Sequence, residues 1–70
     1  MKTNLWTKKN LQRVLASIRK LKNDALSIES APNEMRRYKV TLKGKTILEA
    51  LNGQNGYLVR YEPNFFHKPQ

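Results

Sequence analysis

Residues 7–22 constrain the fold most, because their apolar side chains recur at the spacing of one helical face. Side chains three and four positions apart lie on one stripe of an α-helix. The stripe consists of Leu11, Val14, Leu15, Ile18 and Leu21. Thr7 can cap the first turn with its hydroxyl, and Trp6 and Leu11 occupy the two positions of a hydrophobic staple. The stretch predicts an amphipathic helix that buries this stripe.

The opposite side of this helix is basic, with Lys9, Arg13, Ala16 and Lys20 following one another along it. Residues 1–22 contain no acid, so salt bridges between helical positions i and i+4 cannot form there. Lys8 and Lys9 oppose the helix dipole at its N-terminus, and a bound phosphate would make both lysines favourable. This face indicates a polyanion partner. The alternative is a charged face that only contacts water.

The composition describes one small basic domain, residues 1–70. Its net charge of +9, from 14 Lys and Arg against 5 Asp and Glu, favours acidic partners and says little about the fold. A chain of 70 residues buries one modest core, and without cysteine it cannot use a disulfide, so we expect a homodimer as its supplement. The missing cysteine, signal-peptide core and long apolar run predict a cytoplasmic protein that makes no membrane contact.

Charge is distributed in blocks along the chain. Residues 23–35 contain Asp24, Glu29 and Glu34 and no base, whereas the segments before and after them are rich in Lys and Arg. We expect this middle block to lie away from phosphate or to pair with the basic blocks within the fold.

Two strands are predicted after the helix. Leu26 and Ile28 alternate with polar residues over residues 25–30, which favours a strand, although Ala25 and Ile28 also continue the helical stripe. Residues 36–42 alternate clearly between two sets of side chains. Tyr38, Val40 and Leu42 form one set, and Arg37, Lys39 and Thr41 form the other. The two segments predict a β-hairpin with an apolar face and a basic face.

A second helix is predicted over residues 42–51, where leucine and isoleucine recur at helical spacing before a terminating Gly53. Thr46 and Glu49 match a capping box, which would start this helix later. Residues 57–61 predict a last strand, and residues 63–70 a frayed tail. The fold class expected is therefore α+β, a small single domain in the order helix, hairpin, second helix, short C-terminal strand (α-β-β-α-β).

The amino-acid pattern of residues 10–51 resembles part of the domain of a known DNA-binding family. The matching residues are Leu15, Ile18, Arg19 and Lys20, then Arg36, Tyr38, Val40, Thr41, Gly44 and Lys45, then Ile47, Leu48, Glu49, Ala50 and Leu51. They are similar to the recognition helix, wing and following helix of winged-helix transcription repressors, whose two preceding helices have no counterpart here. The resemblance implies a first helix in the major groove and a hairpin against the adjacent DNA backbone.

These observations predict a non-enzymatic DNA-binding regulator or accessory factor, with duplex DNA favoured over RNA. The predicted contacts are Lys8, Lys9, Gln12, Arg13, Arg19, Lys20, Asn23, Arg36, Arg37 and Lys39. Gln12 and Asn23 can read base edges, whereas the cations contact phosphates. Two alternatives stay open. One is a small viral or plasmid-borne inhibitor that docks on an acidic patch of a host protein of nucleic-acid metabolism, and the other is an RNA binder.

The sequence lacks the usual catalytic and metal-binding patterns. The chain has no cysteine, and its one histidine, His67, is in the expected tail, so the usual catalytic triads have no obvious members. Its acids are scattered, and its glycines lack the Lys-Ser/Thr ending of a phosphate-binding loop. The sequence predicts no enzyme activity, no cofactor and no metal site.

Overall fold

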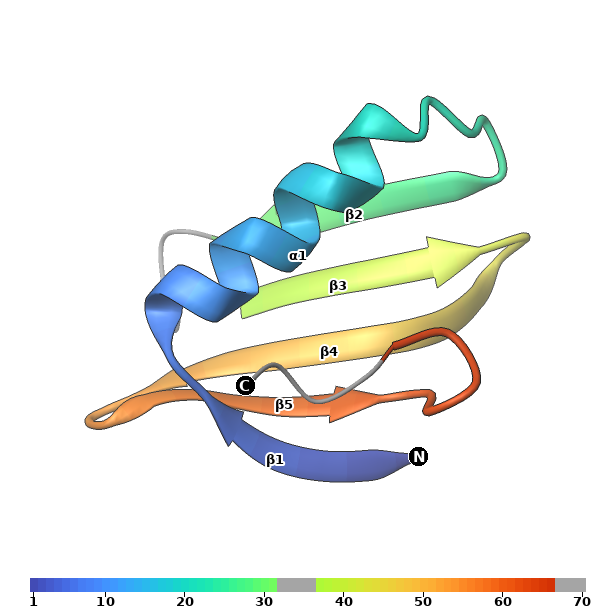
Figure 1. Ribbon diagram of the computed structural model, residues 1–70. Coiled ribbons are helices and arrows are strands. Elements are labelled where there is room, and N and C mark those ends of the chain that lie inside the picture. The colour runs from blue at the N-terminus through green and yellow to red at the C-terminus, as the bar shows by residue number, and fades with distance from the viewer. Residues whose placement is uncertain (32–36, 67–70) are drawn as a thin grey trace.

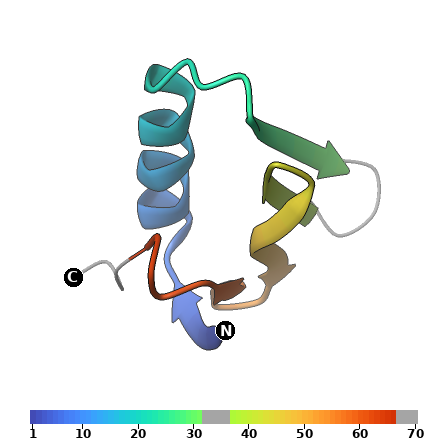
Figure 2. The ribbon, with the colours of Figure 1, turned by 90° about the vertical axis from the view of Figure 1, so that its right-hand side faces the viewer.

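A computed structural model describes residues 1–31 and 37–66 as one helix above an antiparallel sheet. The elements in chain order are β1 (Lys2–Trp6), α1 (Lys8–Lys20), β2 (Leu26–Ala31), β3 (Arg37–Leu42), β4 (Lys45–Gly53) and β5 (Gly56–Tyr61). The 5-stranded sheet has the order β1-β5-β4-β3-β2. The helix connects the two edge strands by crossing one face of the sheet (Figure 1), and the other face has no helix over it (Figure 2).

The helix predicted from residues 7–22 is confirmed. Thr7 precedes it in an extended conformation, and its Oγ1 accepts a hydrogen bond from the Asn10 N–H at 3.1 Å. The helix ends at Lys20, and Lys22 adopts a left-handed φ of 49° as the chain turns toward β2. The strands expected near residues 25–30, 36–42 and 57–61 are also present as β2, β3 and β5.

The second helix predicted over residues 42–51 is wrong, because this segment forms the β3–β4 turn and most of β4. Val40 lies opposite Leu48, whereas Thr41 lies opposite Thr46, so Ile47 is an extra residue in β4. Such a β-bulge breaks the alternation of a strand. Ile47 and Leu48 are consequently both buried, and their adjacent apolar side chains imitate the spacing of a helix. The order α-β-β-α-β is replaced by β-α-β-β-β-β.

Strand β1 was not expected from the sequence. It pairs with β5, where Trp6 lies opposite Tyr57 and Asn4 lies opposite Val59. The side-chain amide of Asn4 donates a hydrogen bond to the Tyr61 hydroxyl at 2.7 Å. Through these contacts, residues 2–6 form part of the sheet and are not only a segment that precedes the helix.

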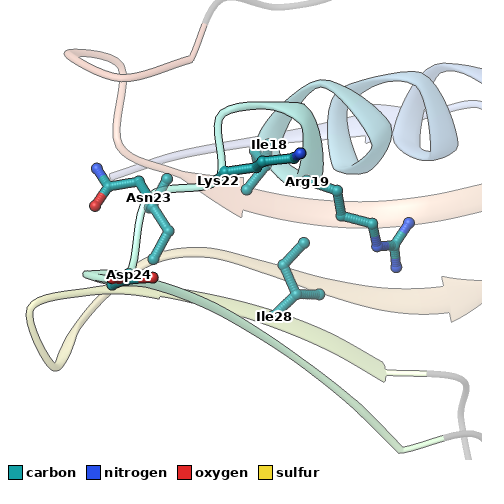
Figure 3. A pocket seen from close by; sticks show the side chains of 7 residues that line it. Ile18, Arg19, Lys22, Asn23, Asp24 and Ile28 are labelled. Carbon is teal, nitrogen blue, oxygen red and sulfur yellow. The ribbon is translucent and has the colours of Figure 1, made fainter.

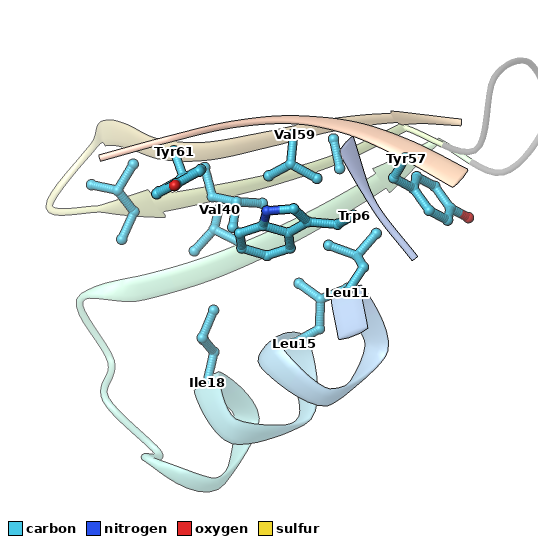
Figure 4. Close-up of a cluster of buried hydrophobic side chains, with 11 residues drawn as sticks. Trp6, Leu11, Leu15, Ile18, Val40, Tyr57, Val59 and Tyr61 are labelled. Atoms are coloured by element: carbon cyan, nitrogen blue, oxygen red, sulfur yellow. The ribbon is translucent and has the colours of Figure 1, made fainter. Parts of the chain in front are cut away.

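The core fills the space between α1 and the sheet. The helix contributes Leu11, Leu15 and Ile18, as the apolar stripe predicted, while Leu21 is 67% exposed. The sheet contributes Trp6, Val40, Ile47, Leu48, Ala50, Tyr57, Val59 and Tyr61 (Figure 4). The rings of Trp6 and Tyr61 have centroids 5.3 Å apart. This packing determines which side of α1 faces outward.

The chain after β5 turns back toward the core. The Glu62 N–H donates to the Ile47 carbonyl, and the Phe66 N–H donates to the Glu62 carbonyl. Phe66 packs against the core, whereas Phe65 is 53% exposed. Residues 63–66 of the expected tail therefore turn back along the core, and residues 67–70 lie outside the described residues. Within residues 1–31 and 37–66, α1 is too short and too polar to cross a bilayer.

Candidate nucleic-acid interface

The outward side of α1 carries the densest group of cations that the sequence singled out. Leu11, Leu15 and Ile18 are held in the core, so the opposite side of the helix faces solvent. The basic residues of α1, Lys8, Lys9, Arg13, Arg19 and Lys20, are all exposed, and we call this set the α1 basic face. Lys9, Arg13 and Lys20 lie opposite the buried stripe, whereas Arg19 lies toward β2. None of them forms an ion pair with another residue in the described ranges. Their charges are therefore available to an acidic partner.

The two ends of α1 differ in how the helix dipole treats these cations. Arg19 and Lys20 lie in the last turn, where a positive charge stabilises the helix. Lys8 and Lys9 lie in the first turn, which contains no acid, and their charges oppose the dipole. Two of the unpaired N–H groups of a first turn lie at these positions. Local stability explains the C-terminal cations but not the N-terminal ones.

The two residues expected to read base edges each make one hydrogen bond within the protein. Gln12 is half-buried, and its Nε2 donates to the Tyr38 hydroxyl at 3.4 Å, so it bridges α1 and β3. Asn23 follows the helix, and its Oδ1 accepts a hydrogen bond from the Ala25 N–H at 2.9 Å. The exposed residues of the α1 basic face itself are all cations, the side-chain type that commonly contacts phosphates.

Arg37 and Lys39 are not part of the α1 basic face. They alternate along β3 with Tyr38 and Val40, whose side chains face α1, so they point to the outer face of the sheet. The sheet therefore lies between these two cations and the helix. Arg36, the third basic residue predicted for the hairpin, lies outside the described residues.

The outer face has a row of alternating charges across its strands. Glu49 lies opposite Arg60 on one side and opposite Lys39 on the other, and Lys39 also lies opposite Glu29. Opposite charges at such positions stabilise a sheet. Lys39, between two glutamates, is therefore better explained as a sheet residue than as a phosphate ligand.

A row of leucines lies beside these charges and was missed by the sequence analysis. Leu58 lies opposite Leu5 on β1 and opposite Leu51 on β4. Leu5 is 58% exposed and Leu58 is 49% exposed. The sequence could have indicated an outward-facing Leu58, because Leu58 alternates with the core residues Tyr57 and Val59. The position of Leu5 could not be predicted without knowing that residues 2–6 form strand β1.

A pocket of about 400 Å³ opens between the end of α1 and β2. Its lining includes Ile18, Arg19, Asp24, Leu26 and Ile28. Figure 3 shows Ile18 of α1 and Ile28 of β2 on opposite sides of it. Leu26 and Ile28 are only half-buried, so the apolar core is less completely covered here than near β5. Sequence periodicity could not indicate this pocket, because it arises from the relative placement of α1 and β2.

Neither a metal centre nor a family assignment follows from these residues. Within residues 1–31 and 37–66 no three carboxylate or histidine side chains come together as a set that could hold a metal ion. The helix that the winged-helix resemblance implies after the hairpin is strand β4. No protein family, no curated protein and no solved structure matches this chain.

Proposed function

We propose that this protein is a non-enzymatic nucleic-acid-binding protein that contacts the backbone of duplex DNA through the α1 basic face. The observation that carries the proposal is the fixed orientation of α1. Because its apolar stripe is anchored in the core, Lys9, Arg13 and Lys20 point away from the sheet together, without ion pairs within the described residues. In a protein of net charge +9, this surface would attract and hold a polyanion.

The dimensions of α1 suit a duplex groove. A helix of 13 residues is about 20 Å long, and the major groove of B-DNA admits an α-helix. Lys8 and Lys9 at one end and Arg19 and Lys20 at the other would contact phosphates on both sides of the groove. Ala16, small and exposed between them, would allow a close approach.

Duplex is favoured over single-stranded nucleic acid because three large aromatic side chains are in the core, which leaves Phe65, at 53% exposure, as the one exposed aromatic ring among the described residues. Trp6, Tyr57 and Tyr61 are at most 3% exposed, so they offer no platform on which unpaired bases could stack. With Gln12 and Asn23 in contacts within the protein, binding would depend mainly on the backbone and tolerate many sequences. An accessory or architectural role fits this better than a sequence-specific regulator.

The test is fluorescence anisotropy of labelled duplex DNA, single-stranded DNA and duplex RNA over a salt series. The helix variant is Arg13→Gln with Lys20→Gln, and the matched control is Arg37→Gln with Arg60→Gln. The control removes the same charge from exposed positions on the outer face of the sheet. We expect duplex DNA to be bound best. The plot of log affinity against log salt should become shallower by about 1.8 in the helix variant only, through loss of two phosphate contacts.

Equal losses in the two variants would contradict the proposal, because overall charge alone would then determine binding. Absence of binding to any duplex at low salt would also contradict it. In that case the α1 basic face would meet an acidic protein surface, and a stoichiometric complex that survives nuclease treatment would identify that partner.

A further inference from the structure

Strand β2 is an edge strand without the usual protection against further pairing. In the described part of the chain it pairs only with β3, and its register runs regularly from Leu26 opposite Leu42 to Ala31 opposite Arg37. Edge strands are commonly protected by lysine, proline or a bulge. The β2 sequence, Leu-Ser-Ile-Glu-Ser-Ala, has no lysine or proline, Glu29 is its one charged residue, and the irregular register of this sheet lies between β3 and β4. Its free edge is therefore a suitable template for another strand.

The core beside this edge is incompletely covered. Leu26 and Ile28 are half-buried on the face of β2 that looks toward α1, and with Ile18 of α1 they line the pocket of about 400 Å³. Figure 2 shows β2 at the side of the curved sheet away from α1. A strand added beside β2 would extend the sheet and cover part of these apolar side chains.

Charge identifies the occupant. Each of the other strands that the structure describes contains at least one lysine or arginine, whereas β2 contains Glu29 and no cation. Two copies of a chain with net charge +9 repel each other, and this repulsion is smallest where no cation lies at the contact. The opposite edge, β1, contains Lys2 and leads directly to Lys8 and Lys9. Among the two edges, β2 is the one suited to a second copy.

We propose that the protein forms a homodimer in which β2 pairs antiparallel with β2 of a second copy, about a two-fold axis normal to the sheet. Residues directly opposite each other in an antiparallel pair point to the same face. Ile28 would lie opposite Ile28 of the partner subunit, which places Ser27 opposite Glu29 of the partner subunit. A register centred on Glu29 would bring two glutamates together, and like charges at such positions are destabilising.

This dimer has one continuous sheet with both α1 helices on the same face. If the proposed function holds, the two basic faces would contact one duplex together, and this consequence rests on that function. The dimer itself does not, because β2 and the α1 basic face share no residue. The two proposals can therefore fail separately.

The experiment is sedimentation equilibrium of the full chain without nucleic acid, comparing wild type with Ser27→Glu and Ser27→Lys. Salt of about 0.15 M leaves only charges within about 8 Å strongly coupled. Ser27 is exposed and lies opposite Thr41, so both variants should keep the fold, which circular dichroism checks. We expect Ser27→Glu to raise the dimer dissociation constant about tenfold, through two new contacts with Glu29 of the partner subunit. Ser27→Lys should leave it unchanged or lower it.

Overall charge predicts the reverse order, because Ser27→Glu lowers the net charge and Ser27→Lys raises it. A wild-type protein that stays monomeric at millimolar concentration would overturn the dimer. A dimer that neither variant changes would overturn the β2 interface, and equal weakening by both would overturn the stated register. None of these results would alter the expected effect of the helix variant on the salt dependence of DNA binding.

Discussion

A Cβ atom on Gly56 would lie 2.5 Å from the backbone carbonyl oxygen of Trp6, where β5 begins beside the end of β1. Gly56 also has a φ of 134°, which side chains rarely allow. We therefore expect Gly56→Ala to lower the free energy of unfolding by about 3 kcal/mol, from backbone strain and overpacking together. Urea denaturation followed by tryptophan fluorescence measures this change.

Gly44→Ala is the matched control for this prediction. Gly44 has a φ of 80° in the β3–β4 turn, and a Cβ built there meets nothing within 4 Å. Its cost should be that of the left-handed conformation alone, about 1 kcal/mol. Equal losses in the two alanine variants would show that the close approach of Gly56 to Trp6 is not important.

Leu15 and Leu21 provide a test of how α1 is oriented. Leu15 is fully buried at 0% exposure, whereas Leu21 is 67% exposed. Leu15→Ala should lower the free energy of unfolding by about 2–5 kcal/mol, and Leu21→Ala should change it by less than about 0.5 kcal/mol. Chemical denaturation of both variants checks the difference, and a larger loss in Leu21→Ala would mean that α1 is rotated.

The charge row on the outer face predicts a salt-dependent effect on stability. Glu49→Lys would put three cations side by side, because position 49 lies between Arg60 and Lys39. We expect a loss of about 1 kcal/mol at low salt that becomes smaller at high salt. Asp24→Lys makes the same charge change in an exposed loop and should have little effect. A loss in Glu49→Lys that salt does not change would argue against the charge row.

Ala16 interrupts the α1 basic face at its centre and is exposed. Ala16→Lys should add one phosphate contact and make the dependence of log DNA affinity on log salt steeper by about 0.9. Ala16→Glu should weaken binding to duplex DNA without lowering thermal stability. Anisotropy and thermal denaturation measure the two effects. Unchanged binding in both variants would remove the centre of α1 from the interface.

The elements that could be predicted from the sequence are those whose pattern is local. The α1 stripe and the Thr7 cap lie within one stretch, so the helix and its outward cations could be identified. In β4 the bulge at Ile47 places two adjacent apolar residues in the core, and this pattern cannot be told from a helix without the register against β3. Prediction failed where pairing between strands decides the structure.

Strand β1 escaped prediction for a related reason. Its polar Asn4 points toward the core and is bonded to Tyr61, whereas its apolar Leu5 is 58% exposed. This reverses the usual alternation of a half-buried strand. Prediction of the candidate site was limited in the same way. The alternation of β3 predicts that Lys39 points away from the core, but its neighbours Glu29 and Glu49 are known only from the register of the sheet.

The hydrogen bond between Asn4 and Tyr61 joins residues 57 positions apart in the chain. During synthesis on the ribosome, β1 emerges first and its partner β5 emerges last among the strands. Successive hairpins of β2 to β5 can form while the chain grows, since each joins neighbours in the sequence. Trp6 cannot pack against Tyr57 and Tyr61 until these two residues have left the ribosome. The final closure of this domain is therefore a late event, and a chain interrupted before β5 would expose its only tryptophan.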